Sequence, residues 1–516
     1  MASSFSSLVL AFFSFVLFLF RRGGRRIKPS LPPGPLPWPL IGNITDLRAN
    51  ELWLLTTQWA KRYGDIVYLH VFGQPLIFIN SPAAAAELME KRSAIYSDRA
   101  PLIMATELCG AGHMVAFTRY GEESRRQRRL MSRGLAQSRI PQYHPLISAS
   151  TRPLLRSLLA SSGRDFVPAI RRYAGGLNLN VVYGLEATRD DDPALLKVEG
   201  ATDLLANHIT AGGGLWAVDI LPFLKHLPTW FPGAGFRRKA AVWKEMIVDS
   251  VDFPFSLLKA SMNAGTAPPS FCSTLLQELD PAAAILGIEE FDIKWIANSM
   301  YAASMDTTIA FTQHLFLALL KHPECLKRAQ AELDSVLGPG PARFPAFEDR
   351  PRLPYLDALF SEILRWGVPV PLGLPHRVTQ DDVYDGRLIP RGSLVFANIW
   401  AMLRDPEVFL DPERFDPERY LEKVDEETAR RRDPRVFVFG FGRRRCPGAH
   451  LVESSVWLML ATMLAMLDIE KPRDRDGNEI EPEVKFENSI FRTATRFAVA
   501  LRPRSDAALA LIEEAT

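Results

Sequence analysis

The segment Phe439-Gly440-Phe441-Gly442-Arg443-Arg444-Arg445-Cys446-Pro447-Gly448 places a cysteine behind three arginines and between glycines. Glycine lets the backbone turn tightly and approach a flat macrocycle closely. The apolar stretch from Ala449 to Leu467 predicts a central helix, so Cys446 stands just before a positive helix end that stabilises a thiolate. A structural cysteine beside a glycine turn is the alternative. Because the thiolate is the form of cysteine that binds metals, the pattern favours Cys446 as a metal ligand.

The same ten residues match F-x-x-G-x-R-x-C-x-G at all six specified positions. In this the chain resembles the cytochrome P-450 family, whose haem-binding signature this is. The resemblance implies haem b as cofactor, Cys446 as the iron ligand and Arg444 as a partner of a haem propionate. It also implies that Phe439, Gly442 and Gly448 contact the haem. A thiolate ligand pushes electron density onto iron and favours O–O cleavage.

A predicted helix over Pro354–Arg365 carries Glu362-Ile363-Leu364-Arg365, an E-x-x-R pattern. Residues three apart share a flank of a helix, so Glu362 and Arg365 are expected to bond each other. Surface ion pairs at this spacing are common, and the pattern gains meaning from its place upstream of the cysteine motif. The family completes this pair with an arginine from a P-E-R-aromatic motif.

The P-E-R-aromatic motif occurs twice, at Pro412–Phe415 and at Pro417–Tyr420. The second copy follows Phe415-Asp416 and fits the family frame aromatic-x-P-E-R-aromatic. We therefore expect Arg419 to join Glu362 and Arg365 as a structural residue that holds the haem loop, and we expect the Arg414 side chain to be solvated.

A long apolar stretch without proline or glycine, Phe291–Lys321, predicts a helix of about eight turns. It carries Tyr301-Ala302-Ala303-Ser304-Met305-Asp306-Thr307-Thr308, which resembles the family's oxygen-activation signature. The resemblance implies that Thr307 donates a hydrogen bond to dioxygen and that Asp306 relays protons from solvent. Hydroxyl groups inside a helix often bond back to the helix instead. Ser304 stands where the family has glycine, so it narrows the groove or adds a hydroxyl to the proton chain.

Two further segments resemble haem-anchoring parts of the family. Tyr120–Arg129 resembles the W-x-x-x-R helix, in which Arg128 fits the arginine while Ser124 replaces the tryptophan. Haem anchoring on that side is therefore expected to be weaker. Pro375-His376-Arg377 resembles a strand with another propionate contact. Neighbouring strand residues face opposite sides, and we expect His376 to point inward.

The N-terminal sequence predicts a membrane anchor. An almost unbroken apolar segment, Ser4–Phe20, is followed by four arginines between positions 21 and 26. This length is near the lower limit for spanning a bilayer, and positive charge after the segment keeps the rest of the chain in the cytosol. We expect an anchor at 1–22, a basic and proline-rich linker at 23–39 and a catalytic domain at 40–516. A cleaved signal peptide and a buried core helix are the alternatives.

The remaining pattern predicts a mainly α protein with small β-sheets, a cytochrome P-450 fold in one large domain behind a transmembrane helix. Expected strands include a hairpin over 66–79 and further strands near 382–389 and 393–397. The four cysteines lie far apart, which argues against a disulfide framework. A formal net charge of +2 decides nothing about nucleic acid, and we expect no such partner.

The resemblance implies a monooxygenase that inserts one atom of dioxygen into a hydrophobic small molecule. The chain has no dinucleotide or flavin motif, so electrons are expected from NADPH through NADPH-cytochrome P-450 reductase. Arg443 and Arg445 either help to dock this acidic partner or are solvated surface charges. A single-pass protein of the endoplasmic reticulum membrane, facing the cytosol, is expected.

Some stretches, such as Asp219–Pro228 and Asp381–Gly386, resemble fungal members of the family that act in secondary metabolism. This resemblance suggests a hydroxylation in the biosynthesis of a fungal secondary metabolite. Two alternatives stay open, a haem-thiolate isomerase or dehydratase of the same fold and a non-catalytic haem-binding protein. Family resemblance places substrate contacts in five largely apolar segments: Met104–Phe117, Leu204–Trp216, Ala303–Thr307, Val370–Leu374 and Ile490–Phe491.

Overall fold

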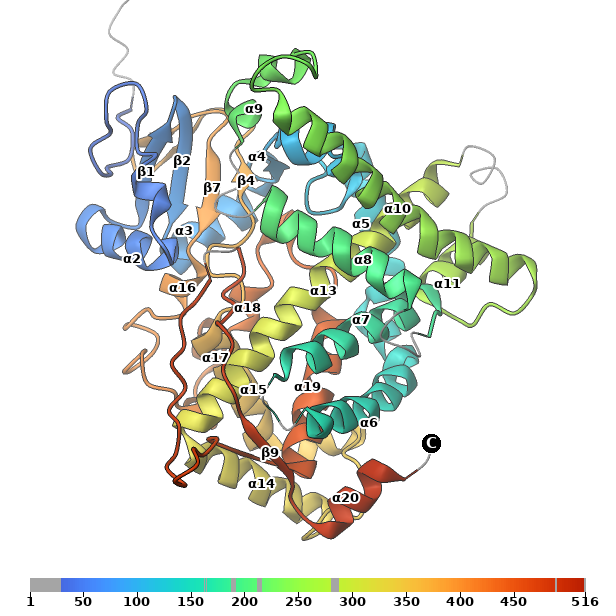
Figure 1. Cartoon of the computed structure of the whole chain (residues 1–516). Helices are drawn as coiled ribbons and strands as arrows, with labels where there is room; N and C mark the ends of the chain where they lie inside the picture. The colour runs from blue at the N-terminus through green and yellow to red at the C-terminus, as the bar shows by residue number, and fades with distance from the viewer. Residues whose placement is uncertain are drawn as a thin grey trace, which may run out of the picture.

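Helix α13 (Ile288–Lys321) crosses the middle of the molecule, and other helices pack along its length (Figure 1). Its 34 residues include no proline and no glycine, as the sequence predicted, and its buried side chains point in all directions around the axis. The computed structural model describes residues 29–514 except 162, 164, 187–191, 211–215, 280–286 and 488–489. The expected anchor, residues 1–22, lies outside the described residues.

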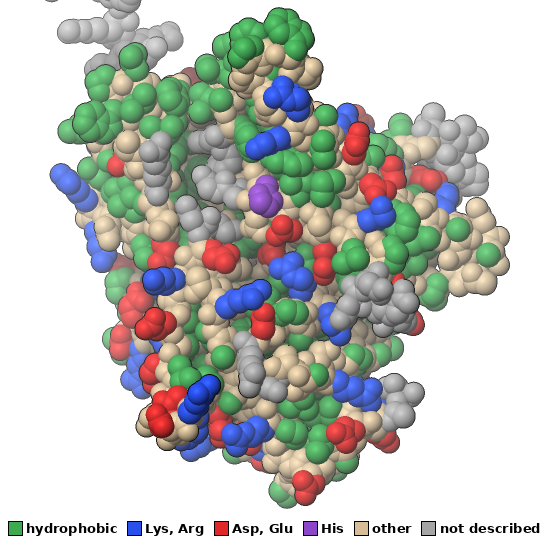
Figure 2. All heavy atoms as spheres, in the orientation of Figure 1, with side chains coloured by type: hydrophobic (Ala, Val, Ile, Leu, Met, Phe, Trp, Pro, Cys, Tyr) green, Lys and Arg blue, Asp and Glu red, His purple; other side chains and the backbone are tan. Residues whose placement is uncertain are grey.

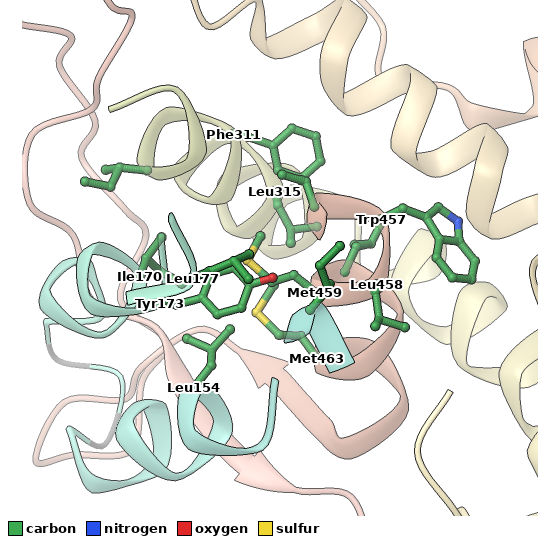
Figure 3. Close-up of a cluster of buried hydrophobic side chains, with 14 of the residues drawn as sticks. Leu154, Ile170, Tyr173, Leu177, Phe311, Leu315, Trp457, Leu458, Met459 and Met463 are labelled. Carbon is green, nitrogen blue, oxygen red and sulfur yellow. The ribbon is translucent and has the colours of Figure 1, made fainter. Parts of the chain in front are cut away.

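Four helices form the main core. Helices α6 (His144–Ala160), α7 (Val167–Tyr183) and α19 (Ala449–Met466) pack with α13 around apolar side chains such as Leu154 (Figure 3). The phenol of Tyr173 on α7 donates to the carbonyl oxygen of Ser455 on α19 at 3.0 Å, which satisfies a polar group inside this core. The fold therefore joins α19, which begins beside Cys446, to α7, which packs along α13.

Helix α19 is apolar on all sides, as expected for a central helix. Within the described ranges it is the one helix long and apolar enough to cross a bilayer, and most of its side chains are buried inside the protein. It is therefore a core helix.

The other helices lie around this core. Those in the first half are α2 (Leu52–Tyr63), α3 (Pro82–Ala85), α4 (Ser93–Tyr96), α5 (Glu122–Leu135), α8 (Pro193–Asp203), α9 (Ala217–Ile220), α10 (Gly235–Asn263) and α11 (Phe271–Gln277). Those in the second half are α14 (Pro323–Leu337), α15 (Pro354–Gly367), α16 (Ile399–Met402), α17 (Glu426–Arg432), α18 (Arg435–Val438) and α20 (Asp506–Glu513).

Strands of the described residues form one small mixed sheet and two two-stranded sheets. The mixed sheet has the order β1-β2-β7-β4-β3, in which β2 pairs parallel with β7 and the other pairs are antiparallel. Its strands are β1 (Ile66–Val71), β2 (Gln74–Ile79), β7 (Leu394–Ala397), β4 (His376–Arg377) and β3 (Asp98–Arg99). The two-stranded sheets are antiparallel and pair β5 (Asp382–Tyr384) with β6 (Arg387–Ile389), and β8 (Leu467–Glu470) with β9 (Ala500–Pro503). The predicted mainly α architecture with small sheets is confirmed.

The proline-rich segment lies against this sheet from Pro33 onward. The N–H of Tyr68 on β1 donates to the Pro33 carbonyl oxygen at 3.0 Å, and the Asn43 N–H donates to the His70 carbonyl oxygen at 2.7 Å. A Cβ on Gly34 would lie 1.9 Å from the carbonyl oxygen of Tyr68, so only glycine permits this approach. The segment is thus attached to the domain before residue 40.

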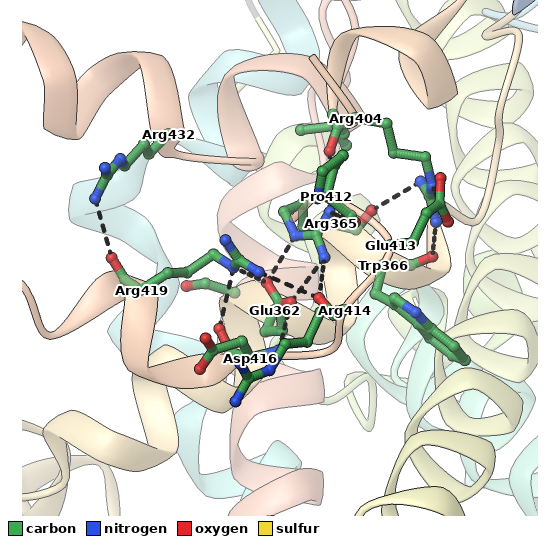
Figure 4. Close-up of polar contacts among 12 residues, drawn as sticks. Glu362, Arg365, Trp366, Arg404, Pro412, Glu413, Arg414, Asp416, Arg419 and Arg432 are labelled. Atoms are coloured by element: carbon green, nitrogen blue, oxygen red, sulfur yellow. Dashed lines mark hydrogen bonds and ion pairs between the residues drawn. The ribbon is translucent and has the colours of Figure 1, made fainter. Parts of the chain in front are cut away.

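A buried ionic cluster on α15 organises the chain that leads to the cysteine loop. The Glu362 carboxylate accepts two hydrogen bonds from Arg365, both at 2.7 Å, and Arg419 Nε lies 3.4 Å from it (Figure 4). The backbone N–H of Asp416 donates to the same carboxylate at 2.8 Å. Glu362 and Arg365 are completely buried, so this anion depends on its partners.

The two arginines also bind the backbone of the segment between α16 and α17. Arg365 donates to the carbonyl oxygens of Leu403, Pro412 and Arg414, and Arg419 also donates to that of Arg414. The Arg414 side chain is exposed, and its carbonyl oxygen makes the contacts. The structure therefore brings Arg419, and not the Arg414 guanidinium, to Glu362.

Glu362→Ala is expected to lower the free energy of unfolding by about 3–5 kcal/mol, because two arginines would lose their buried counter-ion. Arg414→Ala is the matched control and should change it by less than about 0.5 kcal/mol, since its side chain is exposed. Urea unfolding followed by tryptophan fluorescence measures both. Equal losses in the two variants would contradict this account of the cluster.

Candidate functional site

The cysteine loop runs from the end of α18 to the start of α19. The N–H of Cys446 donates to the Phe439 carbonyl oxygen at 2.7 Å and closes the loop. Gly442 has a φ of +52°, and a Cβ there would lie 2.2 Å from the carbonyl oxygen of Met89. This position therefore requires glycine, and the predicted tight turn is present.

The Cys446 sulfur experiences opposing influences. Burial raises the pKa of the thiol, while the backbone N–H of Gly448 and the charges of Arg128 and Arg445 lower it. The effect of burial is the larger one, so the pKa of Cys446 lies above its usual value. A metal ion bound to the sulfur would deprotonate it.

Three arginines and one histidine from four segments lie near one another beside this loop, and burial with the charge of Arg99 lowers the pKa of His376 well below its usual value, so that its ring is neutral. Arg444 donates to the carbonyl oxygens of Ser97 and Thr118, both at 2.7 Å, and is buried. Arg128 on α5 donates to the Arg445 carbonyl oxygen. The other two residues, Arg99 on β3 and His376 on β4, stand opposite each other in the sheet.

Arg99 and His376 are also buried. Arg99 Nη1 donates to the carbonyl oxygens of Leu374 and Pro375, both at 2.8 Å. His376 Nδ1 lies 2.8 Å from the Tyr96 carbonyl oxygen. His376 is buried and its neighbour Arg377 is only partly buried, so His376 is the residue that points inward. The sequence analysis missed Arg99, whose pairing with His376 depends on a strand register that the sequence does not display.

These charges repel one another. Burial, together with Arg444 and Arg128, lowers the pKa of Arg99 to about 9. Burial and Arg128 lower that of Arg444 to about 10. The nearby Asp98 already bonds Arg119 at 2.8 Å and the N–H of Tyr120 at 2.9 Å. An anionic ligand in this pocket would relieve the repulsion.

Three buried polar atoms point to the same conclusion. Among the residues that the structure describes, Arg99 Nε and the hydroxyls of Ser97 and Ser124 have no hydrogen-bond partner. Ser124 is only 1% exposed and lies one helical turn from Arg128 on α5. Buried polar groups are normally satisfied, so donors of this kind fit an acidic, oxygen-rich ligand such as a propionate.

On α13, Thr307 and Ser304 occupy neighbouring faces. Ala303 is exposed although it lies in the middle of a buried helix, and Thr307, four residues on, shares its face. The Thr307 hydroxyl donates to the carbonyl oxygens of Ala303 at 2.9 Å and Ser304 at 3.3 Å. Ala303 and Thr307 therefore line an open groove.

Ser304 borders a different space. Its hydroxyl donates to the Tyr301 carbonyl oxygen at 2.8 Å, and with Thr308 it lines a cavity of about 30 Å³ between α7, α13 and α19. Asn178 and Ser455 add polar groups to that cavity. The Ser304 hydroxyl therefore lies toward this cavity rather than toward the groove lined by Ala303 and Thr307.

Asp306 lies beside Thr307 and is partly buried. Burial raises the pKa of its carboxyl, Arg171 lowers it, and Asp203 and Glu487 raise it. The net shift is upward, so Asp306 binds a proton more readily than an ordinary aspartate. This property suits a residue that accepts and releases protons.

Two of the five segments expected to contact a substrate, Met104–Phe117 and Leu204–Trp216, meet in space. One hydrophobic cluster joins Ile103, Met104, Leu204 and Trp295, with Phe117, Trp216 and Ala302 packed against it. Asp219 connects two of the segments, because its carboxylate accepts from the N–H of Met104 at 2.9 Å and of Trp216 at 3.1 Å. The surroundings of the groove are therefore mostly apolar.

Comparison with known proteins gives one consistent result. The family model for cytochrome P450 matches residues 32–494. The cytochrome P450 monooxygenase claT of Ampulloclitocybe clavipes is 39% identical over 97% of this chain and 96% of its own length. Tryptamine 4-monooxygenase of Psilocybe cyanescens is 38% identical over 94% of this chain and 96% of its own length.

The fold has a counterpart of known structure. A zebra fish cytochrome P450 solved with abiraterone superimposes with a TM-score of 0.69 at 23% identity, covering 88% of this chain and all of the other. The family match, the two fungal relatives, the cysteine loop and the groove on α13 all support the same assignment. The chain belongs to the cytochrome P450 family and is a haem-thiolate monooxygenase.

Proposed function

We propose that this protein hydroxylates a hydrophobic small molecule in fungal secondary metabolism, with haem b held by Cys446 and electrons delivered from NADPH by a membrane-bound reductase. The observation that carries the proposal is the pairing of a complete cysteine loop with Asp306-Thr307 on α13. An isomerase or dehydratase of this fold has no need to protonate dioxygen, so the Asp-Thr pair favours oxygen insertion.

In this proposal the haem propionates lie among Arg99, Arg128, Arg444 and His376. These residues converge without a free anion of their own, and Arg99 Nε awaits an acceptor within the described structure. Ser124 replaces a large aromatic donor of the family with a small hydroxyl. Arg99 and Arg444 then carry more of the anchoring than the α5 side does.

Haem with a thiolate ligand supplies oxygen activation when it is bound. Residues of the chain deliver the protons and determine where in the groove they are donated. The single proton of the Thr307 hydroxyl now points to a backbone carbonyl, so donation into the groove requires the hydroxyl to rotate away from Ala303. Asp306, with its raised pKa, can restore that proton from solvent.

The substrate is proposed to be apolar over most of its surface. The cluster of Ile103, Met104, Leu204 and Trp295 supports this, because apolar walls gain stability from the area removed from water. The relative named tryptamine 4-monooxygenase acts, by its name, on tryptamine, and the aromatic ring of such a substrate is compatible with apolar walls.

Exposed arginines near the cysteine loop support docking of an acidic reductase. Arg125 and Arg443 both lie over the Tyr120 ring, at 6.0 and 5.4 Å from its centroid, and Arg445 is exposed beside them. Clustered positive charge accelerates encounter with a negatively charged partner. Electrons would then enter from the cysteine side of the haem.

We also propose a single-pass anchor in the endoplasmic reticulum membrane, with the catalytic domain in the cytosol. An exposed apolar surface between α9 and α10 supports it, and Figure 2 shows hydrophobic side chains gathered at the top of the molecule. Its exposed residues are Leu221, Phe223, Trp230 and Phe231. Leu36, Trp38 and Leu40, near the first described residues, are exposed as well.

Arg99→Met is expected to speed haem loss about tenfold or more, since hydrogen bonds to charged groups are worth about 1.5–3 kcal/mol. Transfer of haem to apomyoglobin measures the rate. Arg125→Met, an exposed change on α5, is the control and should leave the rate unchanged. Removing a repelled cation should not destabilise the haem-free protein, so equal loss of stability with and without haem would count against this role.

Thr307→Ala is expected to lower the ratio of product formed to NADPH oxidised several-fold, because oxygen leaves as hydrogen peroxide when its second proton arrives too slowly. Thr308→Ala removes the neighbouring hydroxyl, which lines the cavity, and should keep the ratio. Cys446→Ser should abolish both reactions. An unchanged ratio in Thr307→Ala would remove Thr307 from the mechanism and favour the isomerase alternative.

Deleting residues 1–26 should convert the protein from carbonate-resistant to peripherally bound, and Phe223→Ser with Trp230→Ser should then release it into the soluble fraction. Trp230 is 78% exposed, so its replacement costs little stability. Leu410→Ser, at an 87% exposed leucine between α16 and α17, is the control and should leave residual binding intact. Carbonate resistance of the deleted protein would refute a sole N-terminal anchor.

A further inference from the structure

Arg492 connects α13 with two chain segments that include residues expected from the sequence to contact a substrate, Val370–Leu374 and Ile490–Phe491. Its Nη1 donates to His314 Nε2 on α13 and to the Gly367 carbonyl oxygen at the end of α15, both at 3.0 Å. Its own backbone N–H donates to the Pro369 carbonyl oxygen at 2.9 Å. The side chain is buried, although it directly follows Ile490–Phe491.

Among the residues that the structure describes, no carboxylate forms an ion pair with the Arg492 guanidinium, although the charges of Glu51 and Glu413 act on it. It lies 3.6 Å from the centroid of the Phe486 ring and 4.7 Å from that of Trp400. Burial lowers the pKa of Arg492 to about 9, which leaves it charged at neutral pH. Aromatic faces and carbonyl oxygens can hold a buried cation in this way, but only in a narrow range of positions.

His314 is placed to accept a hydrogen bond from Arg492. Burial, Arg492 and Arg404 push the pKa of His314 well below its usual value, so the ring is neutral. Arginine is only a donor, and therefore His314 Nε2 is the acceptor. A Cβ on Gly367 would lie 2.6 Å from His314 Nδ1, so glycine at this place lets the ring lie against the end of α15.

The neighbouring residue makes a second connection to the same strand-like segment. Gln313 Nε2 donates to the Ala494 carbonyl oxygen at 3.0 Å, and Gln313 Oε1 accepts from the Ala494 N–H at 2.9 Å. Both groups are buried. Two successive residues of α13 thus hold the segment that follows Ile490–Phe491, less than two turns beyond Thr307.

From this geometry we propose that Arg492 is a positioning residue for the monooxygenase reaction. It fixes the positions of Ile490–Phe491 and of the segment that starts at Pro369 relative to α13. In this way it determines the size of ligand that the groove accepts above Thr307. The proposal rests on the proposed function only in requiring a haem-bearing groove.

Arginine suits this task better than lysine. Its planar group has several donors in fixed directions and can bond two acceptors while stacking on aromatic rings. A lysine ammonium has three donors, but it has no planar face to stack on aromatic rings and its donors are not held in a fixed fork. A displacement of about 1 Å between a substrate and the reacting centre can reduce a rate by about 100-fold, so a rigid joint between these segments matters for turnover.

Spectral titration with azoles tests the proposal without knowledge of the substrate. Nitrogen ligands that bind the iron shift its absorbance, which gives a Kd for imidazole and for the bulkier 4-phenylimidazole on haem-containing protein. Arg492→Ala should change the Kd of 4-phenylimidazole about fivefold or more through loss of two buried hydrogen bonds. The Kd of imidazole should stay within about twofold, because this small probe needs no contact with the positioned segments.

The matched pair at His314 refines the test. His314→Gln keeps an acceptor for Arg492 and should retain the wild-type ratio of the two Kd values, whereas His314→Leu should reproduce the change seen in Arg492→Ala. Arg496→Ala removes an exposed ion pair with Asp165 from the same C-terminal segment and should have no effect.

Unchanged Kd values in Arg492→Ala, or equal changes for both azoles, would overturn the proposal. If Arg492→Ala retains no haem, the two His314 variants decide by the same ratio. A wild-type protein with no thiolate-type spectrum would instead refute the proposed function, so the two failures are distinguishable.

Discussion

Like charges on Arg99, Arg128 and Arg444 repel one another beside Cys446, and the surrounding fold has to hold them together. They come from β3, α5 and the cysteine loop, with His376 from β4, so no local pattern brings them close. Each arginine donates to backbone carbonyl oxygens, which fix its place without removing its charge. The pocket is therefore complete electrostatically only when an anion enters it.

The Glu362 cluster in the same molecule has the opposite arrangement of charges, with a buried anion among cations. There a buried carboxylate is surrounded by two arginines and a backbone N–H, and no exchangeable ligand is needed. Arg435 connects this region to the cysteine loop, since it bonds Ser361 on α15 at 3.0 Å and Glu453 on α19 at 3.2 Å. The Glu362 cluster, in which every charge has a partner, thus supports the arginine pocket, which lacks an anion. Cofactor binding can therefore neutralise the arginines of the pocket without disturbing the Glu362 cluster.

The sequence allowed the fold class, the main helices and the cysteine loop to be predicted, because each depends on local signals. Arg419 was separated from Arg414 by the frame around a repeated motif, and the structure indeed brings Arg419 to Glu362. Arg99 was missed because its partner is 277 positions away, across the pairing of β3 with β4. Arg492 and His314 were missed for a related reason, since neither residue is part of a motif and each gains its role through a contact between distant segments.

The side of a helix on which a residue lies matters as much as its identity. Thr307 and Thr308 both donate to the Ser304 carbonyl oxygen, yet one lines the groove and the other the cavity of about 30 Å³. A cavity of this size has room for water, and its lining includes hydroxyl and amide groups that would hold it. Water bound there would compete for the Ser304 carbonyl oxygen and weaken its bond to Thr307, which at 3.3 Å is already the longer of the two. The shorter bond of Thr307, to the Ala303 carbonyl oxygen at 2.9 Å, would remain, and the hydroxyl can turn its proton into the groove only when that bond breaks.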